Sequence, residues 1–134
     1  MKTILRLINP AKAHFKDKLD YTNKQIWEIE FKINTSRKVR EDIRLSRDRV
    51  ASGLQTLEEQ AKLAHGDEKK KLEAKLKEEK ETLKRFEAQM DLVDREVVGV
   101  EPSEENPQGQ QGLNHHLESH IELREMVKEY IKTL

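Results

Sequence analysis

The feature of this sequence that most constrains its fold is residues 11–52, a run of 42 residues without glycine or proline. Through this run and beyond it, apolar side chains recur at alternating steps of four and three residues. Such spacing places them on one stripe of an α-helix, and a stripe kept over about seven heptads is typical of a coiled coil. We therefore predict one helix over residues 10–65, about 84 Å long at about 1.5 Å per residue. The fifteen positions of this first stripe are Phe15, Leu19, Thr22, Ile26, Ile29, Ile33, Ser36, Arg40, Ile43, Arg47, Val50, Leu54, Leu57, Ala61 and Ala64.

A second helix is predicted after Gly66, because glycine is the residue best suited to the left-handed conformation that ends a helix. The two residues that follow are acidic, as the positive end of a helix dipole favours. A tight turn between two apolar stripes predicts an antiparallel hairpin in which Ile43 lies opposite Met90. The second helix then covers the first only back to about Ser36, so residues 10–35 keep an uncovered stripe. The second stripe comprises Leu72, Leu76, Glu79, Leu83, Phe86, Met90, Val93 and Val97.

Residues 98–112 contain three glycines and two prolines, and they form the predicted flexible linker. After it, residues 113–134 present a broad apolar face with glutamates early and lysines late, as expected of a third helix. The chain thus divides into a helical hairpin over 1–97, the linker and a C-terminal helix, which together make an all-α fold. The third helix is long enough to fold back onto residues 10–33 or to reach a neighbouring chain, and the sequence leaves both open.

One segment also fits a different fold class, α+β. Trp27, Ile29, Phe31 and Ile33 alternate with charged residues, which is the period of a β-strand. Residues 26–33 would then form a small N-terminal β element with residues 3–8. The continuous helix is our first prediction because the spacing of four and three residues runs through this segment without a break.

Composition argues against several classes of function. Charged residues make up 39% of the chain and aromatic residues 4%, which suits long helices that each bury one stripe. With no cysteine, thiolate metal sites and thiol nucleophiles are excluded. The sequence shows no phosphate-binding loop, nucleophile elbow or pair of enclosed carboxylates. We therefore predict that the protein is not an enzyme and uses no cofactor.

Charge and hydropathy limit the compartment and the partners that we expect for this protein. The 26 basic and 26 acidic residues balance, so no overall field draws the chain to nucleic acid or to a membrane. No segment approaches a membrane-spanning length, and the apolar residues near the N-terminus are too few for a secretory signal. These observations predict a cytoplasmic protein with no membrane partner. Residues 1–49 carry 13 basic and 7 acidic side chains and residues 101–134 carry 3 and 7, so the two ends should attract each other.

Aromatic residues concentrate near the start of the chain, where four of the six lie before residue 32. Trp27 and Phe31 are four residues apart and, on a helix, point away from the apolar stripe. Because tyrosine and tryptophan dominate the energetic centres of protein interfaces, such a face would dock a partner. The alternative is that the third helix or the N-terminal residues simply cover it. The predicted partner-binding residues are Phe15, Leu19, Tyr21, Trp27 and Phe31.

A stripe of arginines is the second candidate surface. Cations at helical spacing can follow the phosphates of a nucleic acid. Against this, three acidic residues are interleaved, and no aromatic residue accompanies the stripe for base stacking. We favour a polar layer that fixes the register of the hairpin, for example with Arg47 against Glu79. The candidate polyanion-binding residues are Arg37, Arg40, Arg44 and Arg47.

Three histidines, His115, His116 and His120, cluster at the start of the third predicted helix. His116 and His120 are four residues apart and share a helix face, as two metal ligands would. Their order is not that of the zinc proteases, which place a glutamate directly after the first histidine, and no third ligand is evident. We predict no metal site here, and a helix end that titrates near pH 6 to 7.

These observations favour a non-catalytic assembly or adaptor protein that acts through coiled-coil contacts with a protein partner, with copies of itself, or with both. The hairpin would act as a spacer, and residues 10–33 and 113–134 would bind. One alternative is a nucleic-acid-associated helical protein that uses the basic stripe over residues 37–49. Another is a small inhibitor or regulator that docks through its aromatic face. The sequence resembles no family that would decide between them.

Overall fold

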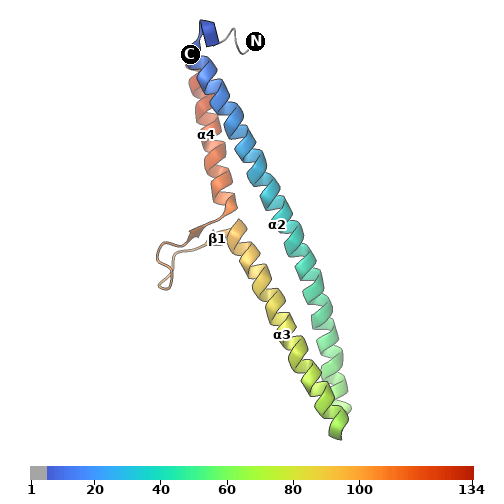
Figure 1. The fold of residues 1–134 in the computed structure, drawn as a ribbon. Helices are drawn as coiled ribbons and strands as arrows, with labels where there is room; N and C mark the ends of the chain where they lie inside the picture. Colours follow the sequence, from blue (N-terminus) through green and yellow to red (C-terminus); the bar gives the residue numbers. More distant parts are fainter. Residues whose placement is uncertain (1–5) are drawn as a thin grey trace. The chain divides into compact units, whose positions relative to one another are not determined.

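The computed structural model describes residues 6–134, and its fold is all-α, with a helical hairpin, a C-terminal helix and one very short pair of strands (Figure 1). This confirms the predicted fold class. Two compact units divide the chain, one comprising residues up to Thr35 together with Arg95–Leu134, and the other comprising Ser36–Asp94. The elements are α2 (Pro10–Leu63), α3 (Gly66–Val97), β1 (Gly99–Val100), β2 (Gln110–Gln111) and α4 (Leu113–Thr133).

The α+β alternative is wrong, because residues 26–33 lie inside α2. Ile26 and Ile33 are both buried, at 4% exposure, whereas Trp27 and Phe31 remain exposed. A strand would place Ile33 on the same face as Trp27 and Phe31, so the observed burial follows the helical period. Residues 6–8 are helical as well, and residues 3–5 of the proposed partner strand lie outside the described residues.

The second unit is a helical hairpin made by residues 36–63 of α2 and by α3 as far as Asp94. The turn passes through Gly66, whose φ of 63° lies in the left-handed region that favours glycine. Across the hairpin, Arg40 lies 2.7 Å from Asp94, and Lys80 lies 3.9 Å from Glu58. Both pairs agree, to within about one turn, with the predicted register that places Ile43 opposite Met90.

The first unit pairs residues 10–35 of α2 with α4, which runs antiparallel beside them (Figure 1). The rings of Phe15 and Tyr130 meet edge to face, with centroids 4.8 Å apart. Thr22 and Val127 are among the buried residues of this pair. The third helix therefore packs on the stripe of its own chain, which is one of the two arrangements that the sequence left open.

Both predicted stripes are the buried faces of their helices. All fifteen positions of the first stripe and all eight positions of the second are buried or half-buried. Each helix pair buries only a narrow stripe, and the buried apolar residues are Ala13, Ile26, Ile33, Leu54, Ala61, Met90, Val97 and Val127. Among residues 6–134, no helix combines the length and the apolar character needed to cross a membrane.

The predicted linker contains a short antiparallel ladder, in which Gly99 pairs with Gln111 and Val100 pairs with Gln110. Its glycines allow backbone segments to approach closely. A Cβ atom on Gly99 would lie 2.4 Å from the carbonyl oxygen of Gln110, and one on Gly112 would lie 2.4 Å from that of Val97. Gly99 also has a φ of 98°, which side chains other than hydrogen rarely allow. The glycines that predicted a linker thus allow close backbone contacts at both ends of this segment.

Candidate protein-binding surface

The structure separates the five predicted partner-binding residues into two groups. Phe15 and Leu19 are half-buried in the first unit, where Phe15 packs on Tyr130 of α4. They belong to the packing of the unit and do not form a free surface. Tyr21, Trp27 and Phe31 are exposed, at 64%, 63% and 60% respectively. Only these three are available to another molecule.

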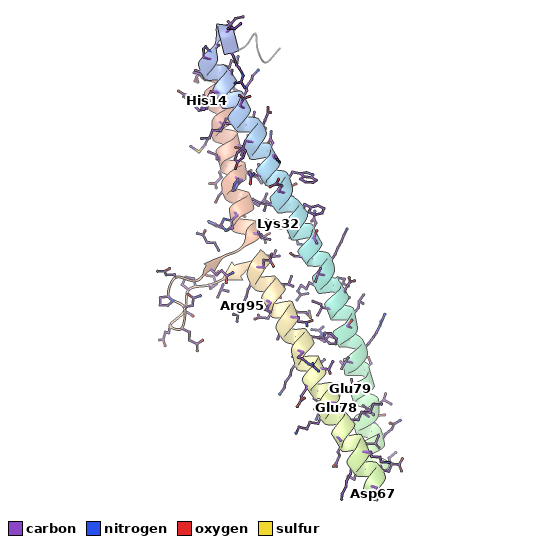
Figure 2. The ribbon with its side chains drawn as sticks, viewed as in Figure 1. His14, Lys32, Asp67, Glu78, Glu79 and Arg95 are labelled. Atoms are coloured by element: carbon purple, nitrogen blue, oxygen red, sulfur yellow. The ribbon has the colours of Figure 1, made fainter. Side chains whose placement is uncertain are left out.

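Trp27 and Phe31 form one continuous aromatic surface on α2. Their rings are stacked, with centroids 5.7 Å apart and planes inclined by 19°. The spacing of four residues brings them together on the helix surface, because side chains at i and i+4 are neighbours there. We call this surface, consisting of the two rings and the residues that border them on α2, the Trp27–Phe31 face. Lys32, labelled in Figure 2, marks the same stretch of α2.

Tyr21 does not extend this face. It precedes Trp27 by six residues, which on an α-helix corresponds to about 120° around the axis. Tyr21 therefore lies on a different side of α2 from the stacked pair. The sequence placed all three in one set because they are close along the chain, and the helical period separates them.

Charged residues border the aromatic pair. Glu28 precedes Phe31 by three residues, and Glu30 follows Trp27 by three, so each is a surface neighbour of one ring. Glu28 is half-buried and Glu30 is exposed. Within residues 6–134, neither carboxylate takes part in a hydrogen bond, an ion pair or a ring contact. Lys24 precedes Trp27 by three residues, and both Lys24 and Lys32 lie four residues from Glu28.

The arginine stripe contains the predicted polar layer, but at a different position from the one expected. Arg40, a position of the first apolar stripe, donates from Nε to Asp94 Oδ1 at 2.7 Å and from Nη2 to Asp94 Oδ2 at 3.3 Å. This two-point ion pair joins α2 to α3 inside the second unit. Arg47, predicted to face Glu79, instead donates to Asp48 at 3.0 Å. The adjacent carboxylate satisfies Arg47 locally, and the contact across the hairpin is made by Arg40.

Arg44 is also engaged along its own helix. Its Nη1 donates to Asp48 at 2.8 Å, and its Nε donates to Glu41 at 2.9 Å. The hydrogen bond from Arg44 lowers the pKa of Glu41 below its usual value of 4.5, and the same pair raises the pKa of Arg44. Arg37 is exposed, and it is the one member of the predicted set that has no such pairing within the described residues. Three of the four arginines therefore already have carboxylate partners.

The histidine cluster at the start of α4 is organised by the backbone. His120 Nδ1 donates to the carbonyl oxygen of His116 at 2.7 Å, and the rings of His115 and His116 meet at 72°. Within residues 6–134, no group of three or more histidine, cysteine, aspartate or glutamate side chains is arranged to hold a metal ion.

Open hollows lie elsewhere on the surface. One, of 460 Å³, lies beside Gly53 in the second unit and is lined by Val50, Leu57 and charged residues of both helices. Another, of 580 Å³, lies on α4 beside Met126 and Tyr130. Met126 is 68% exposed. Sequence reasoning missed both hollows, although a glycine in the interior of a long helix is a signal for close approach or for a gap.

The Trp27–Phe31 face is thus an exposed apolar surface of α2 in the first unit. In comparisons with known proteins, the chain matches no protein-family model, no curated protein and no solved structure.

Proposed function

We propose that this chain is a non-catalytic assembly or adaptor protein, acting through helix-to-helix contacts with other protein chains. The observation that carries the proposal is the stacked and exposed pair of Trp27 and Phe31 on α2. Two large rings held side by side in water offer apolar area that is already ordered, so little conformational entropy is lost when they bind. In the second unit, the antiparallel hairpin would act as a spacer.

Self-association is part of this proposal, and because both apolar stripes are covered within the chain, it would use apolar side chains that remain exposed. The exposed side of α4 with Met126 and Tyr130 offers a second apolar surface for such contacts. We place the protein in the cytoplasm, because its sequence shows neither a secretory signal nor a membrane-spanning segment. A small inhibitor or regulator would use the same Trp27–Phe31 face, and identifying the partner separates it from an adaptor.

The ion pairs of the basic stripe make a nucleic-acid-binding function the weaker alternative. Arg40, Arg44 and Arg47 already pair with carboxylates of the same unit, so a phosphate would have to compete with those carboxylates. A salt-sensitive complex with DNA or RNA that is lost when Arg37 and Arg44 are changed together to glutamate would support this alternative.

Site-specific photocrosslinking tests the proposed function. Benzoylphenylalanine is placed at Phe31, and as a matched control at exposed Gln60 in the second unit. After irradiation in cells of the source organism, we expect defined protein adducts from position 31, whether with another protein or with a second copy. Those adducts should disappear when Trp27 is changed to serine. A chain that gives no adduct from position 31 above the level of position 60, and that sediments as a monomer at all concentrations, contradicts the proposal.

A further inference from the structure

The charges that border the Trp27–Phe31 face indicate what kind of chain it fits. Trp27 and Phe31 are flanked on opposite sides, because Glu30 is the surface neighbour of the first ring and Glu28 of the second. Residues 20–32 hold three carboxylates and two ammonium groups, and both lysines, Lys24 and Lys32, lie four residues from Glu28. Glu30, the surface neighbour of Trp27, has no lysine or arginine three or four residues away on α2, so no cation of its own helix neutralises it.

The flanking carboxylates have no partner that a binding cation would have to displace. Within the described residues, Glu28 and Glu30 make no hydrogen bond, ion pair or ring contact. This distinguishes them from Glu41, further along α2, which already accepts a hydrogen bond from Arg44. An apolar partner on this face would remove the carboxylates from water without giving them a hydrogen bond or an opposite charge. An acidic partner would place like charges beside them.

The rings themselves also favour a cation. The exposed face of an indole attracts ammonium and guanidinium groups, and arginine most often, because the ring carries partial negative charge above its plane. A planar guanidinium can stack on Trp27 and at the same time donate to the carboxylate of Glu30. The rings and the flanking carboxylates thus select for the same type of charge.

We infer that the Trp27–Phe31 face binds an amphipathic helix of another protein, in which arginine or lysine side chains border an apolar stripe. The inference rests on the proposed function and names the chemistry of the partner. A second copy of this chain fits the face less well. In an antiparallel pairing of two copies, each Trp27 would lie on Phe31 of the other copy. Glu28 would then lie close to Glu28 of the other copy, and Glu30 close to Glu30 of the other copy. Such like-charged contacts are unfavourable.

Two synthetic helical peptides test the inference with the full chain. Both have the same leucine stripe and lack tryptophan, but one carries arginine at the positions beside the stripe and the other carries glutamate. Trp27 is the only tryptophan of the protein, so its fluorescence reports directly on this face. We expect the arginine peptide to shift the emission to shorter wavelength in a saturable manner, and the glutamate peptide to leave it unchanged. Changing Glu28 and Glu30 together to glutamine should weaken binding about fourfold, at about a factor of two for each exposed ion pair.

The matched control changes Glu118 and Glu122 of α4 to glutamine, and it should leave the affinity for the arginine peptide unchanged. Equal binding of the two peptides, or no binding of either, overturns the inference. So does an emission shift that depends on protein concentration alone, because a second copy would then occupy the face. That last result would still support the proposed function, which fails if position 31 gives no adduct above the level of position 60 and the chain sediments as a monomer at all concentrations.

Discussion

The side chain of Asn9 joins the start of α2 to the end of α4, because its Nδ2 donates to the carbonyl oxygen of Leu134 at 3.1 Å. Its Oδ1 simultaneously accepts from the backbone N–H of Lys12 at 3.0 Å, which is the geometry of a helix N-cap. Pro10 follows in the first position of the helix, where its missing N–H is not needed. One amide group therefore satisfies backbone groups at the ends of two helices of the first unit.

From this double contact we expect the change Asn9→Ala to lower the free energy of unfolding of the first unit by about 1–2 kcal/mol, the usual effect of losing an N-cap. Hydrogen exchange of the backbone amides in the last turns of α4 measures it, because loss of the Nδ2 contact should accelerate exchange there. The matched control is Asn23→Ala, at an exposed position inside α2, which should be neutral or slightly stabilising. Equal effects of the two changes would show that the cap contributes nothing.

Neighbouring residues of α2 should respond to truncation in opposite ways. Ile26 is 4% exposed and Trp27 is 63% exposed. Changing Ile26 to alanine removes buried methyl and methylene groups and should cost roughly 2–4 kcal/mol of unfolding free energy. Trp27→Ala removes a much larger side chain from water and should cost under about 1 kcal/mol. Urea denaturation followed by circular dichroism measures both, and a larger loss for Trp27→Ala would mean that the ring is covered within the chain.

The contrast between Ile26 and Trp27 also shows how much of this fold the sequence pattern predicts. The spacing of four and three residues identified every position of both stripes, including the polar positions Thr22, Arg40 and Glu79, all of which are buried or half-buried. It succeeded because in a pair of long helices burial is set almost entirely by helical periodicity. The same periodicity contradicts the prediction of a strand over residues 26–33, because it places buried Ile33 on a different face from the exposed rings of Trp27 and Phe31.

Features that depend on the reach of single side chains or on close backbone approach were not predictable in this way. Arg47 pairs with the adjacent carboxylate of Asp48, whereas the contact across the hairpin joins Arg40 to Asp94. The periodic pattern places both arginines on the same stripe, so it cannot tell which of them forms the contact across the hairpin. Likewise, glycine and proline content marks residues 98–112 as irregular, but the ladder between β1 and β2 depends on which glycine faces which carbonyl oxygen.

Two glycines should give opposite results when changed to alanine. A Cβ atom on Gly53 would meet nothing within 4 Å, and the residue lies inside α2, so Gly53→Ala should stabilise the second unit by about 0.5–1 kcal/mol. A Cβ atom on Gly112 would lie 2.4 Å from the carbonyl oxygen of Val97 and 2.5 Å from the backbone nitrogen of Gly99. Gly112→Ala should therefore destabilise the first unit, because backbone atoms must move to admit it. Thermal unfolding of the two variants beside the parent chain measures the contrast, and stabilisation by both would show that the connection around Gly112 is loose.

The pairing of Glu41 with Arg44 should be visible in its titration. The hydrogen bond from Arg44 lowers the pKa of Glu41 below 4.5 in the folded chain, because the guanidinium stabilises the charged carboxylate. A group whose folded pKa is depressed contributes stability above its unfolded pKa, and that contribution is lost as the pH falls through the folded value. We therefore expect the side-chain carboxyl resonance of Glu41 to titrate below pH 4.5, the ordinary value for a glutamate. Arg44→Gln should move the midpoint of Glu41 upward, towards that value. Titration curves followed by nuclear magnetic resonance test this prediction. If Arg44→Gln leaves the midpoint of Glu41 unchanged, the ion pair does not persist in solution, where exposed pairs compete with water and salt.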